Sequence, residues 1–166
     1  MPDVKYALDA NVFIESANRH YAFDLVPAFW DSLISHASSG QIRSIDRIQG
    51  ECSRMKNELA DWVDGDFDDA FDSTDEPEIV QKFGEIMNWV NNQDQFNDPA
   101  RADFASGADG WLIAFAIVKD YVVVTHEVFS RDIQKKVPIP NVCKAFDDKR
   151  CIDTFVMLRE LGVQFG

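Results

Sequence analysis

The sequence predicts a single α/β domain over residues 1–166, a three-layer α/β/α sandwich around a central, mainly parallel sheet. Three observations predict this fold. Short apolar segments alternate with amphipathic helical segments along the chain. The segment 121–125 (YVVVT) is continuously apolar, as in a parallel strand covered on both faces. The length of 166 residues suits one domain with a sizeable core.

Four elements are expected in the first half of the chain: strands at 5–9 and 42–45, and helices at 24–39 and 47–63. Pro27 stands near the start of the first helix and Gly40 just past its end. Asp46 and Gln49 have the spacing of a capping box, which predicts the start of the second helix. The acidic stretch 64–73 contains Gly65 and is expected to be a loop.

Six elements are expected in the second half: helices at 77–92, 107–118 and 153–161, strands at 121–125 and 163–165, and a short element at 139–146. Asn97-Asp98-Pro99 should break the first of these helices. Ser106 is expected to cap the next helix, with Asp109 in its first turn. The body of that helix, residues 111–118, is apolar all round, which predicts that it is buried.

The charge balance is strongly acidic, with a net charge of −13. This argues against a general affinity for polyanions. Nine acids and no Lys or Arg lie between Asp61 and Glu78. That segment is either a solvated loop that keeps the protein soluble or a docking surface for a basic partner.

The three cysteines are odd in number and lack the spacing of metal ligands. This pattern indicates mostly buried, reduced thiols of a cytoplasmic protein and argues against zinc. No apolar run is long enough for a membrane helix, and no signal peptide is expected.

Four acids from separate parts of the chain are expected at one edge of the sheet: Asp9, Glu51, Asp109 and Glu127. The carboxyl ends of parallel strands and the starts of the following helices share that edge, where ligands bind. Two carboxylates ~5 Å apart repel by about 3 kcal/mol at an effective dielectric constant of ~20. Such a cluster therefore requires raised pKa values or a cation, and oxygen ligands favour Mg²⁺ or Mn²⁺.

The chain resembles the PIN-domain superfamily, the ribonuclease fold of VapC-type toxins. The resemblance rests on residues 8–14 (LDANVFI), Glu51, residues 108–114 (ADGWLIA) and residues 123–127 (VVTHE). The tail, from Ile139 to Phe165, is similar to an uncharacterised bacterial PIN-like family. PIN domains commonly end their fourth motif T-x-D, whereas this chain has Glu127, which leaves the role of that ligand open.

The resemblance implies a metal-dependent endoribonuclease that leaves 5′-phosphate and 3′-hydroxyl ends. Asp9 and Asp109 would hold the divalent ion directly, and Glu51 directly or through water. Glu127 would complete a second metal site or position the attacking water. The implied partner is a cognate DNA-binding antitoxin. PIN toxins often form homodimers, and the apolar face of residues 79–90 could provide the contact or belong to the core.

Asn11 and Thr125 are expected to orient the ligands from behind. Four cationic or stacking groups near the first and fourth motifs are candidate RNA contacts: Arg19, His20, Tyr21 and His126. Simple packing would explain residues 18–21 equally well, and His126 could be a plain surface histidine. Six further basic residues could bind phosphates beside the acids: Arg43, Arg47, Arg54, Arg131, Lys135 and Lys136.

Two other functions remain open. A degenerate PIN module would bind RNA or protein without cleavage. Separately, Asp109 could be only a helix-terminal charge, and Glu51 could be a solvated helix residue. A phosphatase similar to the haloacid dehalogenases also begins with a strand that ends in Asp, but it needs D-x-D where this chain has Asn11. Asp103, six residues before Asp109, could assist at the site.

Overall fold

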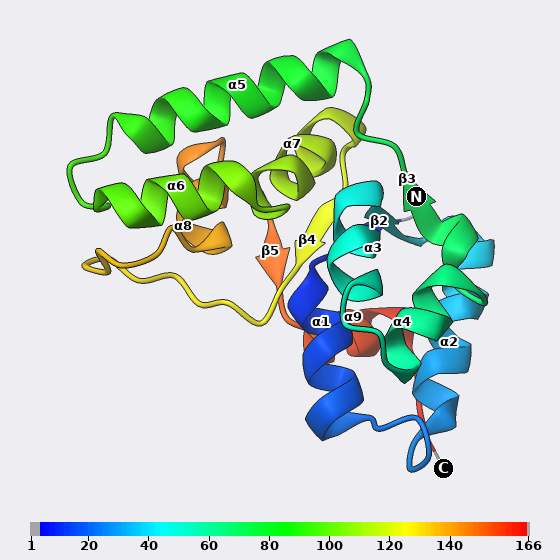
Figure 1. Ribbon diagram of the computed structural model, residues 1–166. Helices are drawn as coiled ribbons and strands as arrows, with labels where there is room; N and C mark the ends of the chain where they lie inside the picture. Colours follow the sequence, from blue (N-terminus) through cyan, green and yellow to red (C-terminus); the bar gives the residue numbers. More distant parts are fainter. Residues whose placement is uncertain (1–3, 166) are drawn as a thin grey trace.

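The protein is built around one five-stranded sheet, in the order β3-β2-β1-β4-β5 (Figure 1). A computed structural model describes residues 4–165. The strands are β1 (Tyr6–Leu8), β2 (Ile42–Ile45), β3 (Phe71–Asp72), β4 (Val122–Val124) and β5 (Cys151–Ile152). Every neighbouring pair is parallel, which confirms the predicted α/β class.

The central strand β1 fixes where a site can form. Its three residues are buried, and Tyr6 lies beside Ile42 of β2 and Val122 of β4. The chain adds β2 and β3 on one side of β1, and later β4 and β5 on the other. The strand order therefore reverses between β1 and β4, and ligands of open parallel sheets bind beyond the strand ends at such a point.

Helices cover both faces of the sheet. They are α1 (Ala10–Glu15), the π-helix η1 (Ser16–His20), α2 (Pro27–Ser38), α3 (Asp46–Ser53), α4 (Glu58–Asp64), the 3₁₀-helix η2 (Asp68–Ala70), α5 (Pro77–Asn91), α6 (Asp98–Ser106), α7 (Asp109–Lys119), α8 (Ile139–Ala145) and α9 (Thr154–Leu161). Right-handed crossovers place α1 to α4 on one face and α5 to α8 on the other. Figure 1 shows α5 and α6 together, away from α1, α2 and α4. The three-layer arrangement is as predicted.

Helix α7 is the buried helix that the sequence predicts. It packs against β1, β2 and β4, and α5 and α6 pack on its outer side. Phe83 of α5 stacks on Trp111 with 4.0 Å between ring centroids. A Cβ atom at Gly110 would lie 3.0 Å from ring atoms of Phe83 and Phe104, so any larger residue here would require those rings to shift. The contacts fix the first turn of α7, where Asp109 lies.

The helix predicted over 47–63 is wrong, because the structure has α3 and α4 with a break between them. Lys56 adopts a left-handed conformation at φ 51°. The Asn57 side chain accepts a hydrogen bond from the Ala60 N–H at 3.0 Å and caps α4. The predicted capping box is also wrong: the Gln49 amide donates to the Val63 carbonyl and to Asp68 instead of returning to Asp46.

The loop predicted over 64–73 is wrong as well, because it contains η2 and β3. Arg43 of β2 donates to the Asp72 carboxylate and to the Asp69 carbonyl, so the acids of this segment partly serve the fold. Asp64 and Glu76 are also bound, by the Ser53 hydroxyl and by Lys119. The segment is therefore not merely a solvated loop.

Sequence reasoning also missed α1, η1, α6 and β5, and it predicted one strand that is absent. Asn97 does not simply break a helix but caps α6, accepting from the Ala100 N–H at 2.9 Å. Ser106 ends α6 and does not cap α7. Two-residue β5 was not expected. The strand predicted over 163–165 is wrong, because these residues are irregular and the Phe165 ring packs near Tyr21.

The apolar face of α5 belongs to the core. Ile79, Ile86 and Val90 are fully buried, so this face is not available for a dimer contact. Cys52 and Cys143 are buried, as expected, while Cys151 is partly exposed. No helix within residues 4–165 combines the length and apolar character needed to cross a membrane.

Candidate active site

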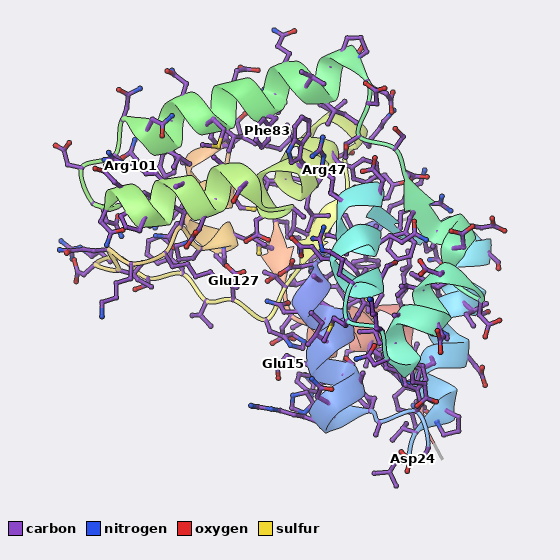
Figure 2. The ribbon with its side chains drawn as sticks, in the orientation of Figure 1. Glu15, Asp24, Arg47, Phe83, Arg101 and Glu127 are labelled. Carbon is purple, nitrogen blue, oxygen red and sulfur yellow. The ribbon has the colours of Figure 1, made fainter. Side chains whose placement is uncertain are left out.

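Three carboxylates converge at the carboxyl edge of the sheet. Asp9 directly follows β1, Asp109 begins α7, and Glu127 lies three residues after β4. One oxygen of each lies within 4.8 Å of the others. Figure 2 shows Glu127 on the segment that leaves β4. We call this group the carboxylate triad.

Strand β1 ends just before Asp9, because Asp9 is the N-cap residue of α1. Its Oδ1 accepts a hydrogen bond from the Ala10 N–H at 2.7 Å and so caps α1. Its Oδ2 accepts from the Thr125 hydroxyl at 2.8 Å. The side chain is buried, with a residue exposure of only 2%. Burying a carboxylate is costly, and these two hydrogen bonds offset only part of that cost.

Asn11 and Thr125 hold the turn that carries Glu127. The Asn11 amide oxygen accepts from the His126 N–H at 3.2 Å. The Thr125 hydroxyl oxygen accepts from the Glu127 N–H at 3.1 Å. These contacts tie the segment after β4 to α1 and to Asp9.

The triad is electrostatically frustrated. Burial, followed by the charges of Asp109 and Glu127, raises the pKa of Asp9 well above its usual range, against the Thr125 and Ala10 hydrogen bonds. Burial and then Glu127 raise the pKa of Asp109 to about 7, with Lys136 opposing and Glu51 adding to the shift. Both shifts disfavour full ionisation unless positive charge is supplied.

Glu127 reaches the triad although it is longer than the aspartate usual in PIN domains. Its Oε1 accepts from the Ile139 N–H at 2.9 Å, at the start of α8. Its Oε2 lies 3.2 Å from the Lys136 ammonium, and its side chain is only 12% exposed. The Glu127 side chain thus binds the start of α8 and also belongs to the triad with Asp9 and Asp109.

Glu51 lies outside the triad. Its carboxylate accepts from the Ala108 N–H at 3.2 Å, the residue just before α7. Ala108 is the N-cap residue of α7, and its side chain makes no capping hydrogen bond. Glu51 of the neighbouring helix α3 therefore caps this end of α7. Glu51 therefore lies at the carboxyl edge of the sheet, as predicted. Its hydrogen bond with Ala108 was not predicted from the sequence.

The four predicted RNA contacts share the flank formed by α1, η1 and α9. Tyr21 stacks on Phe29 with 4.3 Å between centroids, so its ring packs against α2, and its RNA contact stays a prediction. The His126 Nε2 lies 2.6 Å from the Thr154 hydroxyl, and its ring lies edge-on to His20. Burial and His20 lower the pKa of His126. Arg19 is exposed and pairs with Glu15 at 3.6 Å.

The predicted phosphate-binding residues divide into two groups. Arg43 is bound by Asp72, and Arg47 lies 3.9 Å above the Trp111 ring and donates to Thr74. Arg54, Arg131, Lys135 and Lys136 are exposed. Lys135 and Lys136 line a cavity of about 320 Å³ together with Asp109. Sequence reasoning missed the ion pair between Lys136 and Glu127, which joins residues on one irregular segment.

A family model described as a domain of unknown function (DUF4411) matches residues 6–165. The chain belongs to this family. None of the curated proteins compared with it matches significantly.

Two solved structures are similar to this chain. The first is VapBC2 from Rickettsia felis bound to a DNA fragment from their promoter, with 13% identity over 80% of this chain and 98% of that chain and a TM-score of 0.50. The second is PAE2754 from Pyrobaculum aerophilum, with 15% identity over 98% of this chain and 92% of that chain and a TM-score of 0.48. The likeness to the first shows that the DUF4411 chain has a PIN-like fold.

The raised pKa of Asp109 gives a pH-dependence with a definite sign. Between the usual pKa of 3.8 and the folded value of about 7, the folded state retains a proton that the unfolded state has released. In chelator, Asp109 therefore lowers the free energy of unfolding as pH rises from 4 to 7, by about 1–3 kcal/mol. Asp109→Asn should lose less stability over this range than wild type, as measured by urea unfolding.

The matched control is Asp31→Asn, an exposed acid on α2. It should follow the wild-type pH-dependence. An Asp109→Asn curve parallel to the wild-type curve would contradict the frustrated triad.

Proposed function

We propose that this DUF4411 protein is a divalent-metal-dependent endoribonuclease. One observation carries the proposal: Asp9, Asp109 and Glu127, which are far apart in sequence, bring one oxygen each to within 4.8 Å of one another. Neither helix capping nor packing requires all three to meet. A metal-dependent nuclease does require such a group.

The side chains of the triad fit a hard dication. All three offer carboxylate oxygens, and the grouped ligands include no histidine or cysteine, a donor set that favours Mg²⁺ or Mn²⁺ over zinc. Because burial and neighbouring acids raise the pKa values of Asp9 and Asp109, a bound cation would stabilise their charged forms. The protein therefore has both the ligands and the electrostatic reason to bind one.

The proposed roles follow from these contacts. A bound Mg²⁺ or Mn²⁺ would make water a better nucleophile and offset negative charge on the phosphodiester. Asp9 and Asp109 would be direct ligands. Glu127 would be the third ligand or would position the attacking water. Glu51 fixes the first turn of α7 through Ala108 and would act on the metal only through water.

Asn11 and Thr125 would orient Asp9 and the turn that carries Glu127. Exposed Arg19 and His20, with partly buried Tyr21 and His126, would contribute RNA contacts from the α1–α9 flank. The products would carry 5′-phosphate and 3′-hydroxyl ends, as the resemblance to PIN enzymes implies.

We further propose that the protein is the toxin of a bacterial toxin–antitoxin pair and acts in the cytoplasm as a single domain. The similar structure from Rickettsia felis is a VapBC2 assembly bound to promoter DNA. By analogy, the partner of this chain would be a cognate antitoxin that binds DNA.

A degenerate PIN module that binds RNA or protein without cleavage is the second candidate. It is favoured by the contacts of Glu51 and Glu127, which already accept hydrogen bonds from Ala108 and Ile139. The nuclease requires an ion and the module does not, so metal binding measured together with RNA cleavage separates the two candidates.

Wild-type protein should bind Mn²⁺ in calorimetry and cleave total RNA only when Mn²⁺ or Mg²⁺ is present. Asp9→Asn and Asp109→Asn should lose the ion and lower the cleavage rate by about 100-fold or more, since each removes a direct ligand of the proposed catalytic ion. Sequencing the cleaved ends would identify 5′-phosphates. The matched control, Asp31→Asn on α2, should retain both properties.

Mn²⁺ binding without cleavage of any RNA would refute the nuclease and leave a metal-binding module. Absence of Mn²⁺ binding by a folded wild-type protein would refute the metal centre itself.

The toxin role makes a separate prediction in cells. Expression of the wild-type protein alone should slow bacterial growth, because uncontrolled RNA cleavage depletes essential transcripts. Asp9→Asn at the same protein level should restore growth, as followed by optical density and immunoblot. Equal growth with both proteins would refute the toxin role while leaving the nuclease chemistry standing.

A further inference from the structure

The face of Asp109 that is turned toward α6 opens into a cavity of about 320 Å³. Asp103 and Phe104 of α6 line one part of it, and Lys135, Lys136 and Val137 line another. The cavity is thus lined by two carboxylates and two lysine side chains, whose charges balance when no ion is bound. With a cation held by the triad, the cavity would carry net positive charge. It suits an anion that approaches a cation held by the triad.

The two lysines stand on a segment that is held at several points. The Gln134 carbonyl accepts from the Asn97 N–H at 3.0 Å, where α6 begins. The Gln95 amide donates to the Ile133 carbonyl at 2.8 Å. Val137, directly after Lys136, is buried. The backbone around the lysines is therefore fixed, while their side chains remain exposed and able to change partners.

Lys136 has an anionic partner in this structure. Its ammonium lies 3.2 Å from Glu127 Oε2 and opposes the electrostatic effect of Glu127 on Asp109. The ammonium side chain is 54% exposed. Exposed ion pairs are weak, typically below about 1 kcal/mol, so this contact is easily exchanged. Lys135 lines the same cavity and forms no ion pair with any residue within 4–165.

A dication in the triad would bring two positive charges next to the Lys136 ammonium. The ion and the Lys136 ammonium would then compete for Glu127 Oε2. The repulsion between the two cations favours release of Lys136. The nearest new partner for the released ammonium is an anion in the cavity that it already lines.

We propose that Lys136 is an exchangeable counter-charge of this centre: it pairs with Glu127 when no ion is bound and transfers to a phosphate of the RNA strand when one is. This inference rests on the proposed function and deepens it, since it names the groups that receive the phosphate beside the reacting bond. Lys136 thus weakens ion binding by competition and strengthens RNA binding.

These two effects have opposite signs, which makes the proposal testable without measuring catalysis. In calorimetry at low ionic strength, Lys136→Met should bind Mn²⁺ about 5-fold more tightly than wild type, the value of a lost exposed ion pair. With Ca²⁺ in place of Mn²⁺, the same variant should bind a labelled single-stranded oligoribonucleotide more weakly. The slope of log affinity against log salt should fall by about 0.7, as for one lost phosphate contact. A gel should show that the oligonucleotide is intact.

The matched control is Lys135→Met, which removes the same charge from the same cavity without removing an ion pair to Glu127. It should weaken RNA binding and leave Mn²⁺ affinity near the wild-type value. Unchanged or weaker Mn²⁺ binding by Lys136→Met would overturn the proposal, as would an equal gain in both variants. Wild-type RNA affinity in Lys136→Met would also overturn it. Failure of wild-type protein to bind Mn²⁺ at all would instead refute the proposed metal centre.

Discussion

The structure depends on bringing the carboxylates of Asp9, Asp109 and Glu127 together at a point where Asp9 is shielded from water. Asp9 is buried at the end of the central strand, and Asp109 and Glu127 raise its pKa further. Three elements must meet for this to happen: β1, the start of α7 and the segment after β4. The parallel topology supplies the meeting, because the strand order reverses between β1 and β4. Neutral side chains at these three positions would make the fold more stable. A function is therefore the simplest explanation for the presence of three carboxylates.

The surrounding contacts hold the triad in place instead of relieving it. Thr125 and Ala10 bind Asp9, and Gly110 lets α5 and α6 pack closely against the first turn of α7. Glu51 satisfies the Ala108 N–H at that same turn. Each contact fixes a carboxylate's position or backbone, and none supplies a full positive charge to Asp9. Lys136 supplies positive charge to Glu127, from an exposed side chain.

Much of this could be predicted from the sequence, because burial leaves strong patterns. Two apolar segments predicted the strands that precede Asp9 and Glu127. The apolar residues after Asp109 predicted a buried helix that begins near this acid. The parallel topology then predicted that their acids meet. Patterns failed where structure is short or depends on distant partners. β3 and β5 have two residues each and are too short for periodicity, and Lys56 and Asn57 interrupt a helix through a backbone conformation that no apolar pattern records. The contacts of Glu51 and Lys136 join side chains to loop positions that periodicity does not place.

The central claim is that Asp9, Asp109 and Glu127 hold one dication between them. The most direct test is anomalous X-ray diffraction from crystals of the protein soaked in Mn²⁺, recorded at a wavelength where manganese scatters anomalously. The account predicts a single strong manganese peak within coordination distance of all three carboxylates and its loss in crystals of Asp109→Asn. A wild-type crystal with no peak there, or with manganese bound only elsewhere on the acidic surface, would contradict it.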